Sequence, residues 1–306
     1  MKPKKLLSVI VSALLVGAVA VGCGGGSGGG DSASGGGTLT LGNIGWDENI
    51  ALSNLSKGLL EEELGYDSVE LQTLDVGPLF QGVGSGDLDA FQDVWMPNHQ
   101  QYIDPVQDDV ELLEPWYEGV TAYGIAVPDY MDVESLADLN EAGTDEITGI
   151  EPGALFHAQI RDEVIPTYDL DMTLTESSTP AMLAELQRAY EAEEPIVFLG
   201  WSPHWMNAEY DFHYLEDPED GQGNFDEPSQ LATLVRADLE EDDPVAYAFM
   251  EAVTMTEDEM NELQAVIQDV NPDEPLEGAM AWAEENRGVV DPWVEAAEQA
   301  QEQAGS

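Results

Sequence analysis

Short apolar runs alternate with stretches of helical periodicity along the first third of the chain. Residues 39–44 alternate apolar and small side chains, as a strand does, and residues 49–64 repeat leucine and isoleucine at helical spacing. The following segments predict a strand, a short helix and another strand, at residues 69–74, 78–83 and 88–95. This order predicts a β-α-β arrangement.

A second set of strands and helices follows. Residues 120–127 and 147–150 predict strands, and a helix is expected over residues 154–168, directly after Pro152 and Gly153. Strands that alternate with helices in this way are typical of an α/β protein.

Thr179 and Pro180 mark the start of a further helix, which runs to about residue 192. We expect the threonine hydroxyl to be the N-cap and the proline to occupy the first helical position. Residues 195–201 are almost all apolar, which is typical of a strand buried on both faces. From residue 230 onward the pattern predicts helices that are broken at four prolines, namely Pro244, Pro272, Pro275 and Pro292.

The pattern as a whole predicts an α/β fold of two lobes joined by a hinge. We place the first part of lobe 1 at residues 38–128, lobe 2 at residues 129–228, and a final helical segment at residues 229–306. A ligand-binding cleft is expected between the two lobes, since ligands of open α/β sheets bind beyond the carboxyl ends of the strands.

The chain begins like an exported protein. Three lysines precede an apolar run at residues 6–21, which leads to Cys23. Residues 20–23 resemble a lipobox, in which the cysteine is lipidated and the preceding signal is removed, although Ala20 stands where leucine is usual. We therefore predict a lipoprotein signal peptide at residues 1–22. The alternative is an uncleaved anchor, because the apolar run is near the lower limit for a spanning helix.

Residues 23–37 are almost entirely glycine, serine, alanine and aspartate, a composition that predicts a flexible tether. Cys23 is the only cysteine of the chain. If it carries the lipid anchor, the folded part has neither a disulfide nor a thiol nucleophile.

The charge of the chain is strongly acidic. It has 63 Asp and Glu residues against 8 Lys and Arg residues, spread along its whole length, while 43% of the residues are hydrophobic. Phosphate binding needs basic patches, so nucleic acid is excluded as a partner. Such a surface repels itself unless salt shortens the Debye length to ~3 Å near 1 M. We infer a globular protein from a halophile, exposed to brine.

Three tryptophans lie where the predicted strands end, namely Trp46, Trp95 and Trp201, and Trp205 follows four residues after the last of them. Their indole rings are therefore expected to converge on one cleft. A cage of aromatic faces attracts a quaternary ammonium ion, which cannot donate hydrogen bonds, through the ring quadrupoles. The alternative is that these residues are core or rim tryptophans, which need only one partner for the indole N–H.

Seven segments resemble, in order and spacing, the glycine betaine/proline betaine-binding proteins of ABC transporters. They read WDENIALSNLSKGLLEEELGY, VWMPNH, GVTAYGIAVPDY, ITGIEPGA, SSTPAMLAELQRAY, PIVFLGWSPHWMNAEYDFHYLEDP and AYAFMEAV. The resemblance covers about residues 39–287. It implies a type II periplasmic-binding-protein fold, in which two α/β lobes close on a ligand in the cleft between them and the final helical segment returns to lobe 1.

The resemblance also implies the site. The aromatic box falls on Trp46, Trp95 and Trp201, with Tyr123 as a fourth wall around the trimethylammonium group.

The ligand carboxylate needs hydrogen-bond donors. The resemblance implies backbone N–H groups at a helix start, which Gly153 and Ala154 fit. His204 in SPHW is the first choice for a side-chain donor and His99 in WMPNH the second; the alternative for each histidine is a purely structural hydrogen bond.

Some relatives have an aromatic residue near the position of Met255, so a tryptophan box that relies on that position would be incomplete here. Trp205 is expected to pack behind Trp201 instead of lining the cleft. Three other tryptophans are expected to serve packing only, namely Trp116, Trp282 and Trp293.

Betaine and choline remain to be distinguished. Choline binders of similar fold place an acidic residue close to the first box tryptophan, and Asp47 and Glu48 follow Trp46 here. Acidic residues at the start of a helix are the more ordinary explanation of these positions. Because the predicted donors suit a ligand with a carboxylate, glycine betaine is favoured.

The resemblance implies an extracytoplasmic, lipid-anchored binding protein that captures the ligand for osmoprotection and docks on an ABC permease. We expect a monomer without a cofactor or metal. An enzyme is disfavoured, because no G-x-S-x-G, HExxH or Walker A motif accompanies Ser202, His204 and Asp211. A calcium-binding surface lipoprotein is a second alternative, but EF-hand spacing is absent and the acidic run at residues 240–243 is typical of a solvated face.

Overall fold

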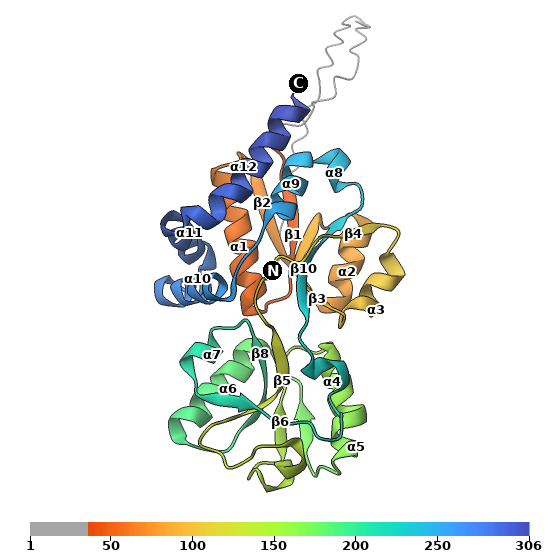
Figure 1. Ribbon diagram of the computed structural model, residues 1–306, viewed down its shortest axis with the longest axis vertical. Coiled ribbons are helices and arrows are strands. Elements are labelled where there is room, and N and C mark those ends of the chain that lie inside the picture. The colour runs from red at the N-terminus through yellow and green to blue at the C-terminus, as the bar shows by residue number, and fades with distance from the viewer. Residues whose placement is uncertain (1–35, 306) are drawn as a thin grey trace, which may run out of the picture. The chain divides into compact units, whose positions relative to one another are not determined.

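The computed structural model describes residues 36–305 of the chain (Figure 1). The predicted signal peptide at residues 1–22, the lipidation site Cys23 and nearly all of the tether lie outside the described residues. The described strands form two five-stranded mixed sheets, one in each lobe. No helix between residues 36 and 305 is both long enough and apolar enough to cross a membrane.

The sheet of lobe 1 has the strand order β2-β1-β3-β10-β4. Strand β1 pairs in parallel with β2 and β3, whereas β10 runs antiparallel to β3 and β4. The central strand β3 is buried along nearly its whole length, because helices cover both of its faces. The strands are β1 (Thr38–Asn43), β2 (Ser68–Thr73), β3 (Ala90–Met96), β4 (Val110–Leu112) and β10 (Gln230–Arg236).

The sheet of lobe 2 repeats this pattern, with the order β7-β6-β8-β5-β9. Strand β6 is parallel to β7 and β8, and β5 is antiparallel to β8 and β9. Strand β8 is buried as its all-apolar sequence predicts. The strands are β5 (Ala122–Pro128), β6 (Glu146–Thr148), β7 (Thr173–Thr175), β8 (Val197–Ser202) and β9 (Phe212–Tyr214).

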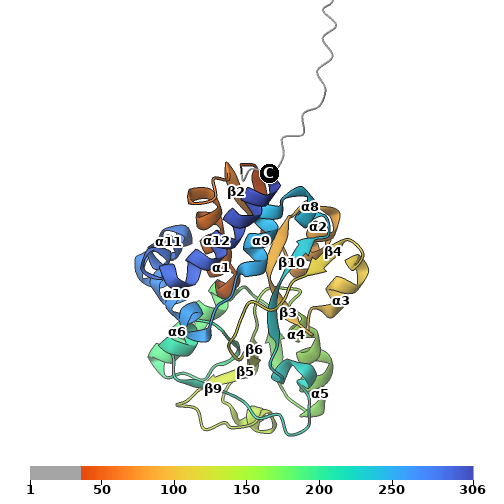
Figure 2. The same ribbon diagram turned by 45° about the horizontal axis from the view of Figure 1, so that its top comes forward.

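The helices cover the two sheets, and those at the end of the chain lie beside α1 on lobe 1 in both views (Figures 1 and 2). Helices α10 and α11 pack on α1, and α12 packs on α9. The helices are α1 (Asp47–Glu62), α2 (Val76–Ser85), α3 (Gln100–Ile103), α4 (Leu155–Gln159), α5 (Ile165–Thr167), α6 (Thr179–Ala192), α7 (Met206–Glu209), α8 (Leu239–Asp242), α9 (Pro244–Ala252), α10 (Glu257–Val270), α11 (Pro275–Glu285) and α12 (Arg287–Ala304).

The chain crosses between the lobes twice, before β5 and before β10. Because β5 belongs to the second sheet, the first crossing lies earlier than the predicted boundary at residues 128/129. The two crossing segments are hydrogen-bonded to each other. The Thr121 hydroxyl accepts from Ser229 N–H at 2.6 Å and donates to the Ser229 carbonyl oxygen at 3.0 Å. Both residues are buried, so this pair marks the predicted hinge.

Three details differ from the sequence-based expectation. Residues 230–236 form strand β10 instead of a helix, because a short, fully buried apolar run has no periodicity that separates the two. Helix α12 continues through Pro292, whose loss of a hydrogen bond is outweighed by packing, including an edge contact between Trp293 and Phe249. The N-cap of α6 is Ser178, whose hydroxyl accepts from Ala181 N–H at 3.3 Å.

Candidate functional site: an aromatic pocket between the lobes

A pocket with about 400 Å³ of empty space lies between the two sheets. Its walls come from the carboxyl ends of β1 and β3 in lobe 1 and of β6 and β8 in lobe 2, together with β5 and a short turn that precedes β10. The lining residues are Trp46, Glu48, Trp95, Asn98, His99, Tyr123, Ile150, Ala154, Leu155, Trp201 and Phe225.

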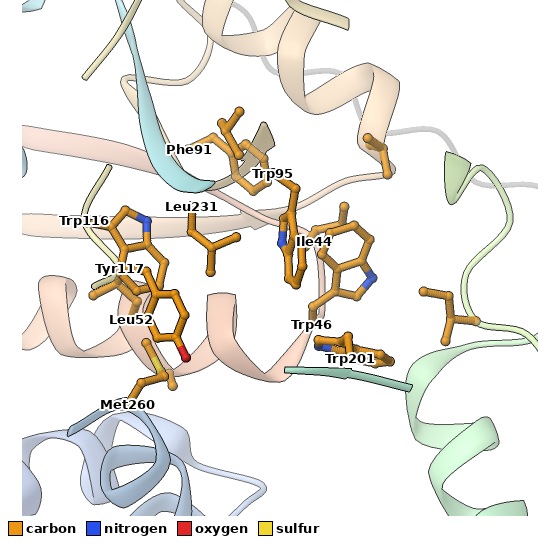
Figure 3. Close-up of a cluster of buried hydrophobic side chains, with 14 of the residues drawn as sticks. Ile44, Trp46, Leu52, Phe91, Trp95, Trp116, Tyr117, Trp201, Leu231 and Met260 are labelled. Carbon is orange, nitrogen blue, oxygen red and sulfur yellow. The ribbon is translucent and has the colours of Figure 1, made fainter. Parts of the chain in front are cut away.

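The three predicted box tryptophans all line this pocket. Trp46 is the N-cap of α1, Trp95 lies near the end of β3, and Trp201 lies near the end of β8. Each ring is buried, with 8%, 5% and 3% of the residue surface exposed, respectively. Figure 3 shows the three side chains gathered where the ribbons of the two lobes meet.

Tyr123, which the resemblance implies as a fourth wall, also lines the pocket. It lies opposite Trp201 in the register of β5 and β8, and its ring centroid is 6.0 Å from that of Trp95 across the cleft. The ring centroids of Phe156 and Phe225 lie 4.9 and 6.0 Å, respectively, from that of Tyr123. Burial raises the pKa of the Tyr123 hydroxyl, so the ring is neutral in the physiological range.

The indole N–H of each wall tryptophan donates to a carboxylate. This bond fixes the edge of the ring, so that the π face is held in a defined orientation. A negative charge at the N–H edge also makes the ring a better partner for a cation. The donor and acceptor pairs are Trp46 to Glu151 at 3.2 Å, Trp95 to Asp93 at 2.9 Å and Trp201 to Glu48 at 2.9 Å.

Two of these bonds join one lobe to the other. Glu151 belongs to lobe 2 and is held there by the Thr179 backbone N–H and hydroxyl, at 2.6 and 2.9 Å. Glu48 belongs to α1 in lobe 1. The two lobes are therefore in contact around the pocket.

Trp205 adds two further contacts between the lobes, outside the pocket. Its indole N–H donates to Asp47 at 2.7 Å, and its backbone N–H donates to the Gln264 side chain at 2.9 Å. The Trp205 ring lies 5.3 Å from that of His204. As expected, Trp205 is not part of the lining.

The two candidate histidines have different positions. His99 lines the pocket. Its Nδ1 accepts a hydrogen bond from the backbone N–H of Trp95 at 3.1 Å, and burial lowers the pKa of the ring to about 3. His99 is therefore neutral, and its proton resides on Nε2. His204 is packed edge-on behind Trp201, at 4.5 Å, with Nδ1 accepting from Met206 N–H and Nε2 at 3.1 Å from Asp47. Of the two histidines, only His99 lines the pocket.

Of the two candidate backbone donors, Ala154 lines the pocket and Gly153 does not. Ala154 lines the pocket as the N-cap of α4, and its N–H lies 3.2 Å from the Glu151 carbonyl oxygen. Gly153 does not line the pocket; its φ of +97° lets the chain turn into the helix, and its carbonyl oxygen accepts from Tyr102 at 3.3 Å. Leu155 lines the pocket as the first helical residue, where the backbone N–H has no partner within the helix.

Sequence reasoning did not place five of the lining residues in the site, namely Glu48, Asn98, Ile150, Leu155 and Phe225. Asn98 and Leu155 each directly adjoin a predicted site residue, a signal that was present in the sequence. Phe225 lies far along the chain from the other walls, and only the tertiary structure brings it near Tyr123. No three His, Cys, Asp or Glu side chains within residues 36–305 are arranged to hold a metal ion.

Comparison with known proteins identifies a matching family. The family described as the substrate binding domain of the ABC-type glycine betaine transport system matches residues 37–285. The glycine betaine/carnitine transport binding protein GbuC of Listeria monocytogenes serotype 1/2a (strain 10403S) is 36% identical over 165 residues, 53% of this chain and 53% of that protein. A glycine betaine/proline betaine-binding periplasmic protein of Escherichia coli (strain K12) is 24% identical and is matched over 50% of its length. The chain thus spans about half the length of these curated relatives.

Two solved structures share the fold over nearly their whole length. Lactococcal OpuAC, in its closed-liganded conformation complexed with glycine betaine, has 33% sequence identity and a TM-score of 0.76, covering 84% of this chain and 99% of that one. An ABC-transporter choline binding protein in complex with choline has 26% identity and a TM-score of 0.75, covering 88% and 98%. The predicted two-lobe type II fold is confirmed.

Proposed function

Because this chain belongs to the family of substrate-binding domains of ABC-type glycine betaine transport systems, we propose that it captures glycine betaine in the pocket between its lobes. Membership confirms the resemblance noted in the sequence, and it confirms that the chain is a transport protein and not an enzyme. The observation that carries the proposal is the set of three buried tryptophans around one pocket, each with its N–H edge on a carboxylate.

The trimethylammonium group sits among Trp46, Trp95 and Trp201, with Tyr123 closing the fourth side. The quaternary nitrogen carries no N–H, so the head group cannot donate a conventional hydrogen bond. An aromatic cage therefore stabilises the cation through the ring quadrupoles and apolar contact, and leaves no hydrogen-bonding group of the site without a partner. The pocket's lining is dominated by aromatic and aliphatic side chains, which suits this head group.

The ligand carboxylate lies toward His99 and the start of α4. The Nε2–H of a neutral His99 donates one hydrogen bond, and the backbone N–H of Leu155, the first residue of α4, donates another. The Ala154 N–H already donates to the Glu151 carbonyl oxygen, so Ala154 contributes to the lining and supplies no donor. His99 therefore takes the role that the sequence assigned first to His204. Closure of the lobes excludes water and strengthens these bonds.

Choline is the second candidate, because Glu48 lines the pocket and is fully buried. Choline carries a net positive charge and a hydroxyl group but no carboxylate. A buried carboxylate favours such a ligand more than a zwitterion, since the charge of a zwitterion is already balanced.

The remaining parts of the proposal concern the cell. The chain acts outside the cytoplasm of a halophile and is anchored to the membrane by a lipid on Cys23. It is a monomer, and its closed, ligand-bound form docks on a membrane permease. The permease then imports the ligand for osmoprotection. The acidic composition of the sequence and its lipobox-like start support this assignment.

The test is a tryptophan fluorescence titration in molar salt with glycine betaine, choline and proline as separate ligands. Saturation by glycine betaine, with weaker responses to the other two, is expected because only glycine betaine fills both the cage and the donor site. Saturation by choline alone would replace the first candidate by the second. Folded protein that responds to no quaternary ammonium ligand contradicts both.

A further inference from the structure

Two buried carboxyl groups at the pocket lack a full set of partners: Glu48 is part of the lining, and Asp93 lies behind Trp95. Glu48 on α1 and Asp93 on β3 are both 0% exposed. Each uses one oxygen to accept an indole N–H, from Trp201 and Trp95 respectively. Among residues 36–305, the other oxygens, Glu48 Oε1 and Asp93 Oδ2, have no hydrogen-bond partner.

No basic side chain of the described chain compensates this pair. Every lysine and arginine between residues 36 and 305 forms its ion pair with another carboxylate. These pairs are Lys57 with Glu61, Arg161 with Glu176, Arg188 with Glu185 and Glu194, Arg236 with Asp89, Asp238 and Asp242, and Arg287 with Glu63 and Asp291.

The other titratable groups near the pair are neutral or acidic. Burial raises the pKa of Tyr117, which precedes β5, and of Tyr123 on β5, while burial lowers the pKa of His99 at the start of α3. The acidic groups are Asp47 on α1, Glu151 after β6 and Glu257 at the start of α10. The charge of Asp47 raises the pKa of Glu48, that of Glu151 raises the pKa of Tyr123, and that of Glu257 raises the pKa of Tyr117. The remaining titratable group nearby, His204, packs on Trp201, but its Nε2 lies 3.1 Å from Asp47 and its Nδ1 accepts from Met206 N–H, so it is not a partner of either carboxyl group of the pair.

Burial and mutual repulsion act in the same direction on the pair. Burial, followed by the charge of Asp93, raises the pKa of Glu48 well above its usual value. Burial raises the pKa of Asp93 to about 7, although the Trp95 N–H opposes the shift. Buried carboxyl groups that lack a counter-charge are expected to hold a proton, because a proton is the least costly way to remove the charge.

On the basis of the proposed function, we propose that Glu48 and Asp93 are the counter-charge of the ligand's cationic head, and that they release a proton to solvent when the head enters the aromatic pocket. The charges balance. In the empty pocket one of the two groups holds a proton, so that the pair carries one negative charge; the occupied pocket contains two carboxylates beside one quaternary ammonium. The proton leaves for water, and no covalent bond of the ligand changes.

The two candidate ligands act differently on this pair. A quaternary ammonium cannot hydrogen-bond to a carboxylate, so it acts only through its electric field, which is strong in a buried pocket. Choline presents its full positive charge. Glycine betaine carries a carboxylate that partly cancels the field, so it is expected to displace a smaller fraction of a proton than choline does.

The experiment is isothermal titration calorimetry of the full chain at pH 7, in molar salt and a non-ionic detergent, with choline and with glycine betaine. Each titration is repeated in phosphate and in Tris, whose ionisation enthalpies differ, so that the difference in binding enthalpy counts the protons released. About half a proton or more per bound choline is expected, since a group near its pKa is about half protonated. The affinity should rise with pH by at most about tenfold per pH unit.

Isosteric variants locate the proton. Glu48→Gln and Asp93→Asn each keep an oxygen for the indole N–H, so the wall tryptophans retain their partners, and the double variant should release no proton. Glu62→Gln, on the exposed side of the same helix α1, is the matched control and should release as many protons as the unmodified chain. If the double variant does not fold, Asp93→Asn alone should lower the count.

The outcomes separate the inference from the proposed function. Saturable binding with the same enthalpy in phosphate and in Tris means that no proton is released; it overturns the inference and leaves the proposed function intact. Release that is unchanged in the folded double variant also overturns it, because another group then holds the proton. Folded protein that binds neither ligand at pH 6 or pH 8 contradicts the proposed function itself.

Discussion

The tryptophans of the pocket differ from those of the lobe 1 core in what their rings meet, and not in how deeply they are buried. Trp46, Trp95 and Trp201 are at most 8% exposed, while Trp116, Trp282 and Trp293 are 1% exposed. The second set packs entirely within lobe 1, as Figure 3 shows for Trp116 beside Tyr117 and Leu52. The first set borders a pocket with about 400 Å³ of empty space.

The partner of the indole N–H does not by itself separate the two sets. Trp116 donates to the Gln92 backbone carbonyl at 2.9 Å, but Trp282 donates to the Glu262 carboxylate at 3.1 Å, as the pocket tryptophans do to theirs. The distinguishing feature is position, because the pocket set stands at strand ends and two of its three bonds cross between the lobes. A tryptophan at the carboxyl end of a strand is therefore the better indication of a site.

The largest expected effect is on stability, in the core set. Trp293→Ala removes a ring that packs against Phe249 between α12 and α9 and should lower the free energy of unfolding by about 3–5 kcal/mol. Chemical denaturation in molar salt measures this. The folded fraction should bind the ligand with unchanged affinity; a folded variant with more than about a tenfold loss of affinity would place Trp293 in the function of the site.

The next effect is on binding, in the pocket set. Trp201→Ala should weaken ligand binding by about 2–4 kcal/mol, through loss of ring area and of cation–π attraction. Trp201→Phe retains a smaller quadrupole and should give an intermediate affinity. Calorimetry of the three proteins measures the series, and equal affinity of Trp201→Ala and the unmodified protein would remove Trp201 from the site.

A third effect distinguishes the two regions by pH. The folded-state pKa of Asp93, about 7, is raised above its ordinary value of 3.8. Its contribution to stability is therefore fully present below about pH 4 and is lost as the pH rises through 7. Asp93→Asn should make the ligand-free protein about 1–3 kcal/mol more stable than the unmodified chain at pH 8, with a smaller gain at pH 5. Unfolding curves at both pH values test this, and a gain that does not change with pH contradicts it.

The smallest effect separates the two histidines. His99→Ala should weaken glycine betaine binding by about 1–2 kcal/mol, because it removes a donor to the ligand carboxylate, and should affect choline much less. His204→Ala should alter both ligands equally, because its ring only supports Trp201 and contacts Asp47. Paired titrations with the two ligands measure the ratio, and a selective loss of glycine betaine in His204→Ala would restore the first sequence-based assignment.

Much of the architecture was predictable where amphipathic periodicity or a long apolar run was present. The expected helix at residues 49–64 is α1, and the apolar run at 195–201 is β8. The strand β10 was not predictable, because a short run buried on both faces is equally consistent with a buried helix. Four of the described strands have only three residues; β6 overlaps the strand expected at residues 147–150, whereas β4, β7 and β9 had no pattern that could be recognised in the sequence.

The site was predictable in its aromatic walls and less so in its polar groups. Strand-end tryptophans follow a general rule for α/β sheets, so Trp46, Trp95 and Trp201 could be proposed from the sequence. For Glu48 the sequence left two explanations open, an acidic residue of the site and an acidic residue at a helix start, because the helix dipole alone favours the second. The burial of Glu48 depends on Trp201, which is distant in the sequence and approaches only when the two lobes meet.

The central claim is that the aromatic pocket holds the quaternary ammonium group, and a crystal structure of the chain grown with glycine betaine tests it most directly. The account predicts the trimethylammonium group among the faces of Trp46, Trp95 and Trp201, with the carboxylate directed at His99 Nε2 and the backbone N–H of Leu155. A ligand bound elsewhere, or one whose carboxylate faces the tryptophans, would contradict it.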